Sequence, residues 1–264
     1  ARWLPRLAEL PQALHEMAYH SVNRLIDYQD EAYAEDWWIR LLDVVDRDPD
    51  QENYSCSHEV GRHLALWMTF EDIPRVAQLK VRPEREAMIR SEVKATSDQP
   101  ITLAEFFHPR IEEVAALLPR KWGEALLNSD IARRWSTRLL GPRVLRTDRI
   151  SMQLIFRCLA ALRRFRRSTL GYAHERHMID RWYGATLSAQ GYDRSMAIAA
   201  LGGLVKGYGE TRHRTTSRLM HILDYLERSP DSDACTITSL YTAAMNPDAA
   251  FDPSVVLLHS RELA

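Results

Sequence analysis

The sequence predicts an all-α fold, a globular multi-helix bundle without a significant sheet. Apolar residues recur at spacings of three and four along most of the chain, which is the period of an amphipathic helix, and no run alternates with the period of two that is typical of strands. The 10 glycines and 12 prolines are fewer than is usual for 264 residues. With 45% hydrophobic residues this length can bury a sizeable core, so we expect one helical domain over residues 1–264.

In the first half, apolar spacing and capping residues define the expected helices. The segment from Gln12 to Asp48 contains no Gly or Pro, and predicts one long helix or two helices joined near 28–30. Ser57 can cap a helix that runs to 68, and Asp72 followed by Pro74 opens the next one. The pattern Thr102–Glu105 is a capping box, which predicts a helix from 102 to about 119.

Gly141–Pro142 is the clearest break in the first two thirds, and a sub-domain boundary is expected there. Beyond it, a stripe of apolar residues predicts a long helix whose stripe faces the core: Ile150, Leu154, Cys158, Leu162 and Phe165. Further helices are expected up to Gly191, from 193 to 205 and around 219–226. The tail 229–264 contains Pro and Asp residues and is expected to be less regular.

The net charge of −1 conceals two oppositely charged segments. Residues 9–59 hold 13 acidic residues against Arg24, Arg40 and Arg47, whereas residues 133–181 hold 13 arginines against Asp148, Glu175 and Asp180. Two interpretations follow. In the first, the two segments would pack against each other as complementary faces. In the second, the arginine-rich segment would bind an external anion or an acidic partner.

The residue patterns predict neither a catalytic residue nor a metal site. Cys56, Cys158 and Cys235 form no CxxC, and are expected to be reduced and mostly buried. His58 and His63 are five residues apart, so they do not share the helix face of a zinc protease motif. The sequence contains no nucleophile elbow, P-loop or dinucleotide-binding glycine motif. Apolar runs are too short to cross a bilayer and no signal peptide is evident, so a cytoplasmic protein is expected.

The segment Lys206–Arg214 is a candidate anion-binding site. One glycine on each side of an aromatic residue allows backbone conformations that other residues rarely adopt, just before a helix begins. The free N–H groups at the start of a helix attract phosphate or carboxylate. The residues predicted to hold the anion are Lys206, Gly207, Tyr208, Gly209, Arg212 and Arg214, together with Arg75 and Lys80. The alternative is a helix–loop–helix connector whose basic residues pair with the acidic segment.

A second basic cluster consists of Arg163, Arg164, Arg166 and Arg167. Clustered arginines around Phe165 are compatible with nucleic-acid binding. A sequence pI near 6.9 and the place of Phe165 on the apolar stripe disfavour that function. We expect a solvated face or a contact with another protein subunit.

Several unusual strings resemble one family. The strings are Arg24–Asp30 with Tyr33-Ala34, His63–Lys80, the arginine-rich helices of 162–182, and Lys206–Thr211. They resemble the C-terminal helical region of indolepyruvate oxidoreductase subunit beta, and the likeness covers most of residues 1–228. The chain departs from that family at Glu210, where Asp is usual, and near Thr215, where a Gly is usual.

The resemblance implies a part of a 2-oxoacid:ferredoxin oxidoreductase. Such enzymes use thiamine diphosphate with magnesium to decarboxylate an arylpyruvate, pass electrons through iron–sulfur clusters to ferredoxin, and transfer the acyl group to coenzyme A. The family's N-terminal gamma-type α/β domain and the signatures for these cofactors have no counterpart in this chain. We therefore expect a fragment, an accessory helical domain that binds no cofactor itself.

Two functions are implied, and a third is weaker. In the first, the domain would be an assembly module that contacts the alpha subunit and the missing N-terminal domain. Alternatively, its basic residues hold coenzyme A phosphates or the substrate carboxylate. The weaker third function is a stand-alone helical enzyme, for which the sequence offers no nucleophile or base.

Overall fold

The computed structural model describes residues 2–96, 98–107, 110–130, 132, 134, 143–206, 209–247 and 251–262. Backbone contacts divide the chain into two compact units: unit 1 comprises residues 1–69 and 177–264, and unit 2 comprises residues 70–176. The break predicted at Gly141–Pro142 lies outside the described residues. None of the described helices combines the length and the apolarity needed to cross a membrane.

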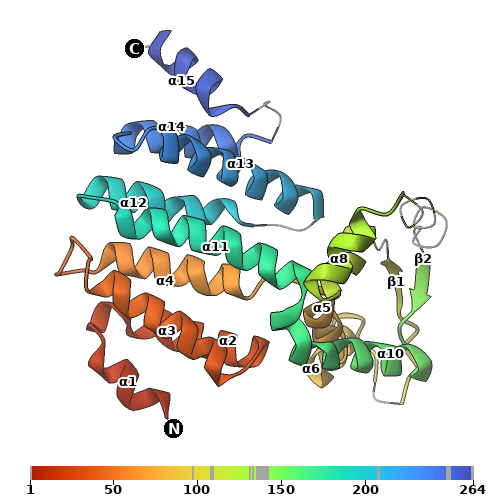
Figure 1. The fold of residues 1–264 in the computed structure, drawn as a ribbon. Helices are drawn as coiled ribbons and strands as arrows, with labels where there is room; N and C mark the ends of the chain where they lie inside the picture. Colours follow the sequence, from red (N-terminus) through yellow and green to blue (C-terminus); the bar gives the residue numbers. More distant parts are fainter. Residues whose placement is uncertain are drawn as a thin grey trace. The chain divides into compact units, whose positions relative to one another are not determined.

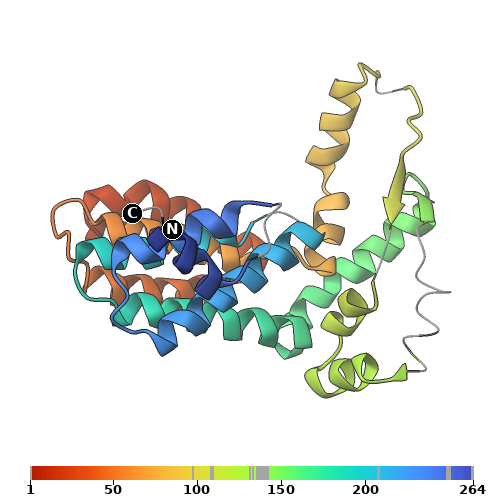
Figure 2. The same cartoon turned by 90° about the horizontal axis from the view of Figure 1, so that it is seen from above.

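Unit 1 is a stack of helices (Figures 1 and 2). Its elements are α1 (Trp3–Glu9), the 3-10 helix η1 (Gln12–Leu14), α2 (His15–Tyr28), α3 (Glu31–Val45), α4 (Ser55–Met68), α11 (Leu170–Ser188, of which 177 onward belongs here), α12 (Tyr192–Ala200), η3 (Leu201–Leu204), α13 (Gly209–Arg228), α14 (Ala234–Met245) and α15 (Pro253–Glu262). Helices α2, α3 and α4 pack on one another, α12 packs on α4, α14 packs on α12, and α15 packs on α14. Each layer therefore contacts mainly its neighbours, as in helical-repeat proteins.

Buried aromatic side chains form the centre of this stack. Trp37, Trp67 and Trp182 are almost fully buried, and the ring centroids of Trp67 and Trp182 are 5.9 Å apart. The indole nitrogen of Trp37 donates to the carbonyl of Gly61 at 3.0 Å, and that of Trp182 donates to the carbonyl of Ile198 at 2.9 Å. The large apolar rings are thus buried without leaving these two N–H groups unpaired.

Capping residues explain where several helices begin. Tyr28 ends α2, and the side chain of Asp30 accepts a hydrogen bond from the backbone N–H of Tyr33 at 2.8 Å, so two helices occupy the segment 12–48. The predicted cap at Asp72 is confirmed, because its carboxylate accepts from the N–H of Arg75 at 2.8 Å. The predicted cap at Ser57 is wrong, because α4 already begins at Ser55.

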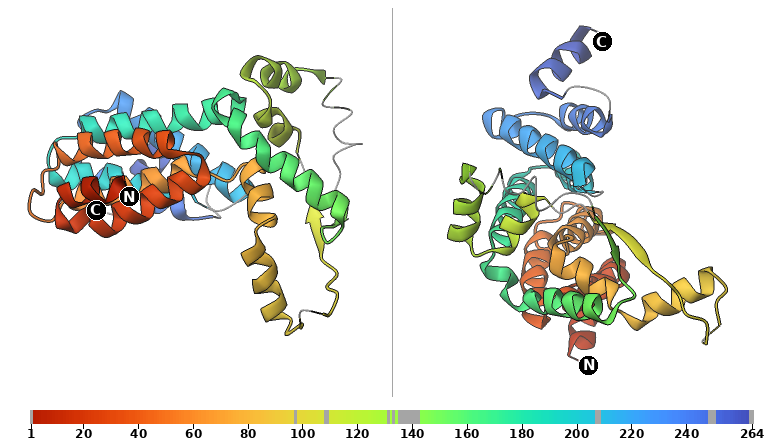
Figure 3. Two further views of the ribbon diagram at one scale, coloured as in Figure 1. Left: turned by 90° about the horizontal axis from the view of Figure 1, so that it is seen from below. Right: turned by 90° about the vertical axis from the view of Figure 1, so that its right-hand side faces the viewer.

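Unit 2 contains shorter elements. These are α5 (Ile73–Lys80), α6 (Pro83–Glu92), β1 (Ala104–Phe107), α7 (Ile111–Leu117), α8 (Arg120–Leu127), β2 (Arg143–Arg146), α10 (Ile150–Ala161), η2 (Leu162–Ser168) and the first turns of α11. Helix α10 packs on α5 and follows β2 after a short turn (Figure 3). Strands β1 and β2 pair antiparallel, with Phe106 opposite Val144.

The all-α class is confirmed, because the described residues are mostly helical and contain a single small sheet, this two-stranded ribbon. The helix predicted from the Thr102–Glu105 pattern is wrong: residues 104–107 are a strand, and the helix begins at Ile111. The Glu105 carboxylate forms ion pairs with Lys80 and Arg85 instead of returning to the backbone at 102. Tertiary partners have replaced the local hydrogen bonds that define a capping box.

Candidate functional site

The predicted anion segment lies at the start of α13 in unit 1. Lys206 is exposed, Gly209 has a φ of +53°, and Gly207 and Tyr208 lie outside the described residues. Arg212 and Arg214 follow in the first turns of the helix. The left-handed backbone at Gly209 is the conformation that the glycine-rich pattern suggested.

Arg214 and Arg218 form a pair of cations one turn apart on α13. Nε of Arg214 is buried without a hydrogen-bond partner. Arg218 is itself buried, and its guanidinium donates to the carbonyl of Ala244 at 3.0 Å and to that of Asn246, at the end of α14. Burial and the nearby Arg214 lower the pKa of Arg218. The sequence did not single out Arg218, because its role depends on α14, which is distant in the chain.

Arg75 and Lys80 belong to α5 of unit 2. Arg75 donates from Nη1 to the side-chain oxygen of Gln78 at 2.9 Å, and Lys80 forms an ion pair with Glu105. Burial lowers the pKa of Lys80, and the charge of Arg85 lowers it further. These two predicted anion ligands therefore have partners within unit 2.

The arginine cluster of 163–167 lies on η2, and its members have different surroundings. In a 3-10 helix residues three apart lie in one row, so Leu162 with Phe165 forms one row and Arg164 with Arg167 forms another. Both of these rows are exposed, as is Arg163. Arg166 is only 2% exposed and pairs with Asp72. It therefore lies inside the unit, whereas the other three predicted contact residues are exposed.

The apolar stripe that was predicted to face the core is on the surface of unit 2, and that prediction is wrong. Ile150 is 89% exposed, Leu154 62% and Phe165 60%, while Cys158 and Leu162 are exposed as well. The residue of α10 that is buried is Phe156, on the opposite side of the helix. We call this surface the α10 face and define it by Ile150, Leu154, Arg157, Cys158, Ala161, Leu162, Arg164, Phe165 and Arg167.

The core beneath the α10 face is small. Among the described residues of unit 2, the buried apolar side chains are Phe70, Ala77, Ala115 and Phe156, with Pro74 beside them. The exposed large apolar side chains are more numerous: Met88, Val93, Phe106, Trp122, Val144, Ile150, Leu154, Ile155, Leu162 and Phe165. Four of these, Ile150, Leu154, Leu162 and Phe165, gather on the α10 face, and a contiguous exposed apolar patch is typical of a protein contact.

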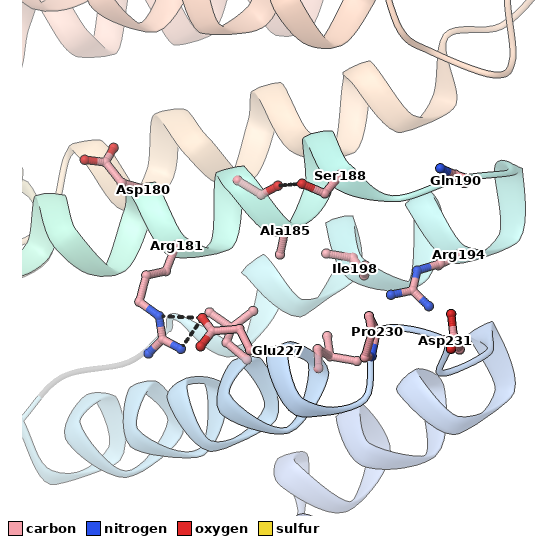
Figure 4. Close-up of a pocket in the computed structure, with 13 residues that line it drawn as sticks. Asp180, Arg181, Ala185, Ser188, Gln190, Arg194, Ile198, Glu227, Pro230 and Asp231 are labelled. Atoms are coloured by element: carbon pink, nitrogen blue, oxygen red, sulfur yellow. Dashed lines mark hydrogen bonds and ion pairs between the residues drawn. The ribbon is translucent and has the colours of Figure 1, made fainter.

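Unit 1 carries a groove of about 710 Å³ between α11, α12, α13 and the loop after α13 (Figure 4). Ile198, Leu223 and Leu226 contribute the apolar part of its lining. At one end Arg181 pairs with Asp224 at 2.7 Å and with Glu227 at 2.6 Å, and at the other end Arg194 donates to the backbone carbonyl of Ser232. The charges of its lining are of both signs, and Arg181 and Glu227 of the lining pair with each other.

The histidine motif considered as a metal helix has another role. His63 is buried on α4, with Nε2 2.7 Å from Oε1 of Glu59, and Arg62 reaches the same carboxylate at 3.0 Å. These contacts lower the pKa of Glu59 to about 2, with the hydrogen bond to His63 as the largest cause. Within the described ranges, no group of three or more His, Cys, Asp or Glu residues is arranged to hold a metal ion.

The cysteines differ in accessibility. Cys56 is buried, which raises the pKa of its thiol to about 12. Cys158 and Cys235 are exposed, so the expectation of mostly buried thiols is wrong for these two. Cys158 belongs to the α10 face, whereas Cys235 lies on α14 of unit 1.

Residues 14–225 match the model of a protein family described as "Family of unknown function (DUF6537)". The matched segment extends from α2 of unit 1 through all of unit 2 to α13. No curated protein and no solved structure matches the chain.

Proposed function

The chain belongs to the DUF6537 family, and we propose that it is an accessory assembly domain of an indolepyruvate, or arylpyruvate, ferredoxin oxidoreductase in the cytoplasm. Its role is to hold parts of the complex together while other parts perform the thiamine-diphosphate-dependent oxidative decarboxylation. The observation that carries the proposal is the α10 face, an exposed apolar surface above a small core.

Unit 2 has little fully buried apolar surface of its own. A unit of this length ordinarily has its own hydrophobic core, and fully burying a Leu, Ile or Phe side chain stabilises a fold by about 1.5–3 kcal/mol. In the described part of unit 2 few large apolar side chains are fully buried, most are half-buried, and those of the α10 face are exposed to water. A partner that covers the α10 face would bury this surface and would stabilise the folded unit through binding.

The resemblance of the sequence to the C-terminal helical region of indolepyruvate oxidoreductase subunit beta supports the choice of complex. The proposed partners are the alpha subunit and the N-terminal gamma-type domain of that family. Thiamine diphosphate, magnesium, iron–sulfur clusters and coenzyme A belong to those partners in this proposal. The contribution of this chain is the contact surface.

Co-purification tests the proposal. The chain is co-expressed with the tagged alpha subunit of an indolepyruvate ferredoxin oxidoreductase, and the complex is followed by size-exclusion chromatography. We expect the two to elute together, in equal amounts. A chain that elutes as a separate monomer, with the alpha subunit fully active without it, would contradict the assembly function.

A second function, the binding of a phosphate or carboxylate anion, is favoured by one observation. The buried Nε of Arg214 has no hydrogen-bond partner, and a buried donor left unpaired costs about 1–3 kcal/mol, which an anion would recover. Calorimetric titration with coenzyme A and with dephospho-coenzyme A tests it. We expect binding that Arg214→Met abolishes, and an absence of heat at millimolar ligand would remove this function.

A further inference from the structure

We propose that the α10 face binds an acidic amphipathic helix of a partner protein. This inference rests on the proposed assembly function and specifies the chemistry of the contact. Three features of the face support it: the arrangement of its apolar side chains, the sign of its charge, and the unsuitability of the face for contact with itself.

The apolar side chains form one continuous ridge. Ile150, Leu154 and Ala161 are spaced by four and seven residues, so they lie on one side of α10, opposite Phe156. The row of Leu162 and Phe165 on η2 continues the ridge beyond the end of α10. At about 1.5 Å per helical residue the part on α10 is roughly 18 Å long, which matches three to four turns of a partner helix. Ridges of this kind pack into the grooves of another helix.

The charge along α10 and η2 themselves is of a single sign. Residues 149–174 contain six arginines and neither an acidic residue nor a lysine. Arg166 pairs with Asp72 inside the unit, and the side chains of Arg157, Arg164 and Arg167 are exposed beside the apolar ridge. Carboxylates on the flanks of a partner helix would be attracted to these guanidinium groups, and Arg binds carboxylates with two parallel hydrogen bonds.

Two other occupants fit the face less well. In a symmetric contact between two copies, each α10 face would oppose the same face, so arginines would lie against arginines. Single-stranded nucleic acid would be attracted by the charge, but it binds through stacking on aromatic rings, and the ridge is mostly aliphatic, with Phe165 as its one ring. An acidic amphipathic helix satisfies both the apolar ridge and its basic flanks.

Fluorescence anisotropy with a synthetic peptide tests the inference. The probe is a labelled helix of about 18 residues with Leu at positions i, i+4, i+7 and i+11 and Glu at most others, and its control has the same composition in a scrambled order. We expect saturable binding of the probe, at least tenfold weaker binding of the scrambled peptide, and affinity that falls as salt is raised.

Two variants locate the contact. Leu154→Asp should weaken binding at least tenfold, because it places a carboxylate in the apolar ridge, and Arg164→Gln with Arg167→Gln should reduce the salt dependence. Leu66→Asp, an exposed leucine on α4, is the matched control and should bind like the native chain. Circular dichroism verifies that each variant is folded.

Three results of the binding assay would overturn the inference: no binding of the probe, equal binding by Leu154→Asp, or equal binding of a single-stranded RNA of similar length. Self-association that Leu154→Asp abolishes would favour a second copy and would also overturn it. If the alpha subunit co-purifies with Leu154→Asp as it does with the native chain, the assembly function stands and the α10 face is not its contact.

Discussion

The guanidinium of Arg166 lies buried against the carboxylate of Asp72 and binds it with two hydrogen bonds, Nε to Oδ2 at 2.5 Å and Nη2 to Oδ1 at 2.9 Å. The same Oδ1 caps α5 through the N–H of Arg75. One carboxylate thus joins the start of α5 to η2, two segments that are distant in the sequence. Because the apolar core of unit 2 is small, this ion pair is a main element of its structure.

Replacing Arg166 should therefore destabilise unit 2. Arg166→Met leaves the half-buried carboxylate of Asp72 without its buried cation, and we expect a loss near the lower end of the roughly 3–5 kcal/mol that breaking a buried ion pair costs. Arg163→Met removes an exposed arginine of the same η2 and should change stability by less than about 0.5 kcal/mol. Urea unfolding followed by circular dichroism compares the two, and equal midpoints would show that the pair is unimportant.

Two glycines of unit 1 should respond differently to the same substitution. A Cβ added at Gly202 would lie 2.8 Å from atoms of both His63 and Trp182, whereas one added at Gly184 would have no atom within 4 Å. Gly202→Ala should destabilise the fold by about 1–3 kcal/mol through overpacking. Gly184→Ala lies within α11 and should be neutral or stabilising, by up to about 1 kcal/mol. Thermal unfolding measures both, and a neutral Gly202→Ala would contradict the close packing described around Trp182.

Stability should depend on Glu59 in acid. The pKa of Glu59 is lowered to about 2 in the folded chain, from about 4.5 when the group is unperturbed. The ionised form is favoured by folding, so its contribution is complete above about pH 4.5 and is lost as the pH falls toward 2. Glu59→Gln should remove roughly 1–3 kcal/mol at pH 6 and little at pH 2. Exposed Glu52→Gln is the control, and parallel stability curves for Glu59→Gln and the native chain would refute the prediction.

The three cysteines should differ in reactivity. Burial raises the pKa of Cys56 to about 12, so at pH 8 this thiol carries almost no thiolate, which is the reactive form. Alkylation of the native chain followed by peptide mass spectrometry should label Cys158 and Cys235 and spare Cys56 until the protein is unfolded. Rapid labelling of Cys56 in the folded protein would show that its environment is open.

Local features were predictable from the sequence because the relevant interactions are local. The predicted cap at Asp72 joins residues three positions apart, and so does the cap at Asp30, where the sequence indicated a helix junction near 28–30. The Thr102–Glu105 pattern failed for the opposite reason, since Glu105 finds its partners in Lys80 and Arg85, which precede it by twenty residues or more.

The candidate site was only partly predictable. The sequence identifies an apolar stripe on α10 but not its environment, because the same side chains suit an internal core and a surface that binds a partner. The arginine cluster was recognised, yet nothing local distinguishes Arg166, which is buried, from Arg164, which is exposed. The unpaired Nε of Arg214 depends on three-dimensional packing and has no signature in the sequence.

Protection of Cys158 tests the central claim, that the α10 face is the surface that a partner protein covers. The native chain, alone and in complex with the alpha subunit, is treated with a short pulse of iodoacetamide, and the labelling of Cys158 is compared with that of Cys235. We predict that the complex slows the alkylation of Cys158 at least tenfold and leaves Cys235 unchanged. Equal labelling of Cys158 with and without the bound subunit would contradict the claim.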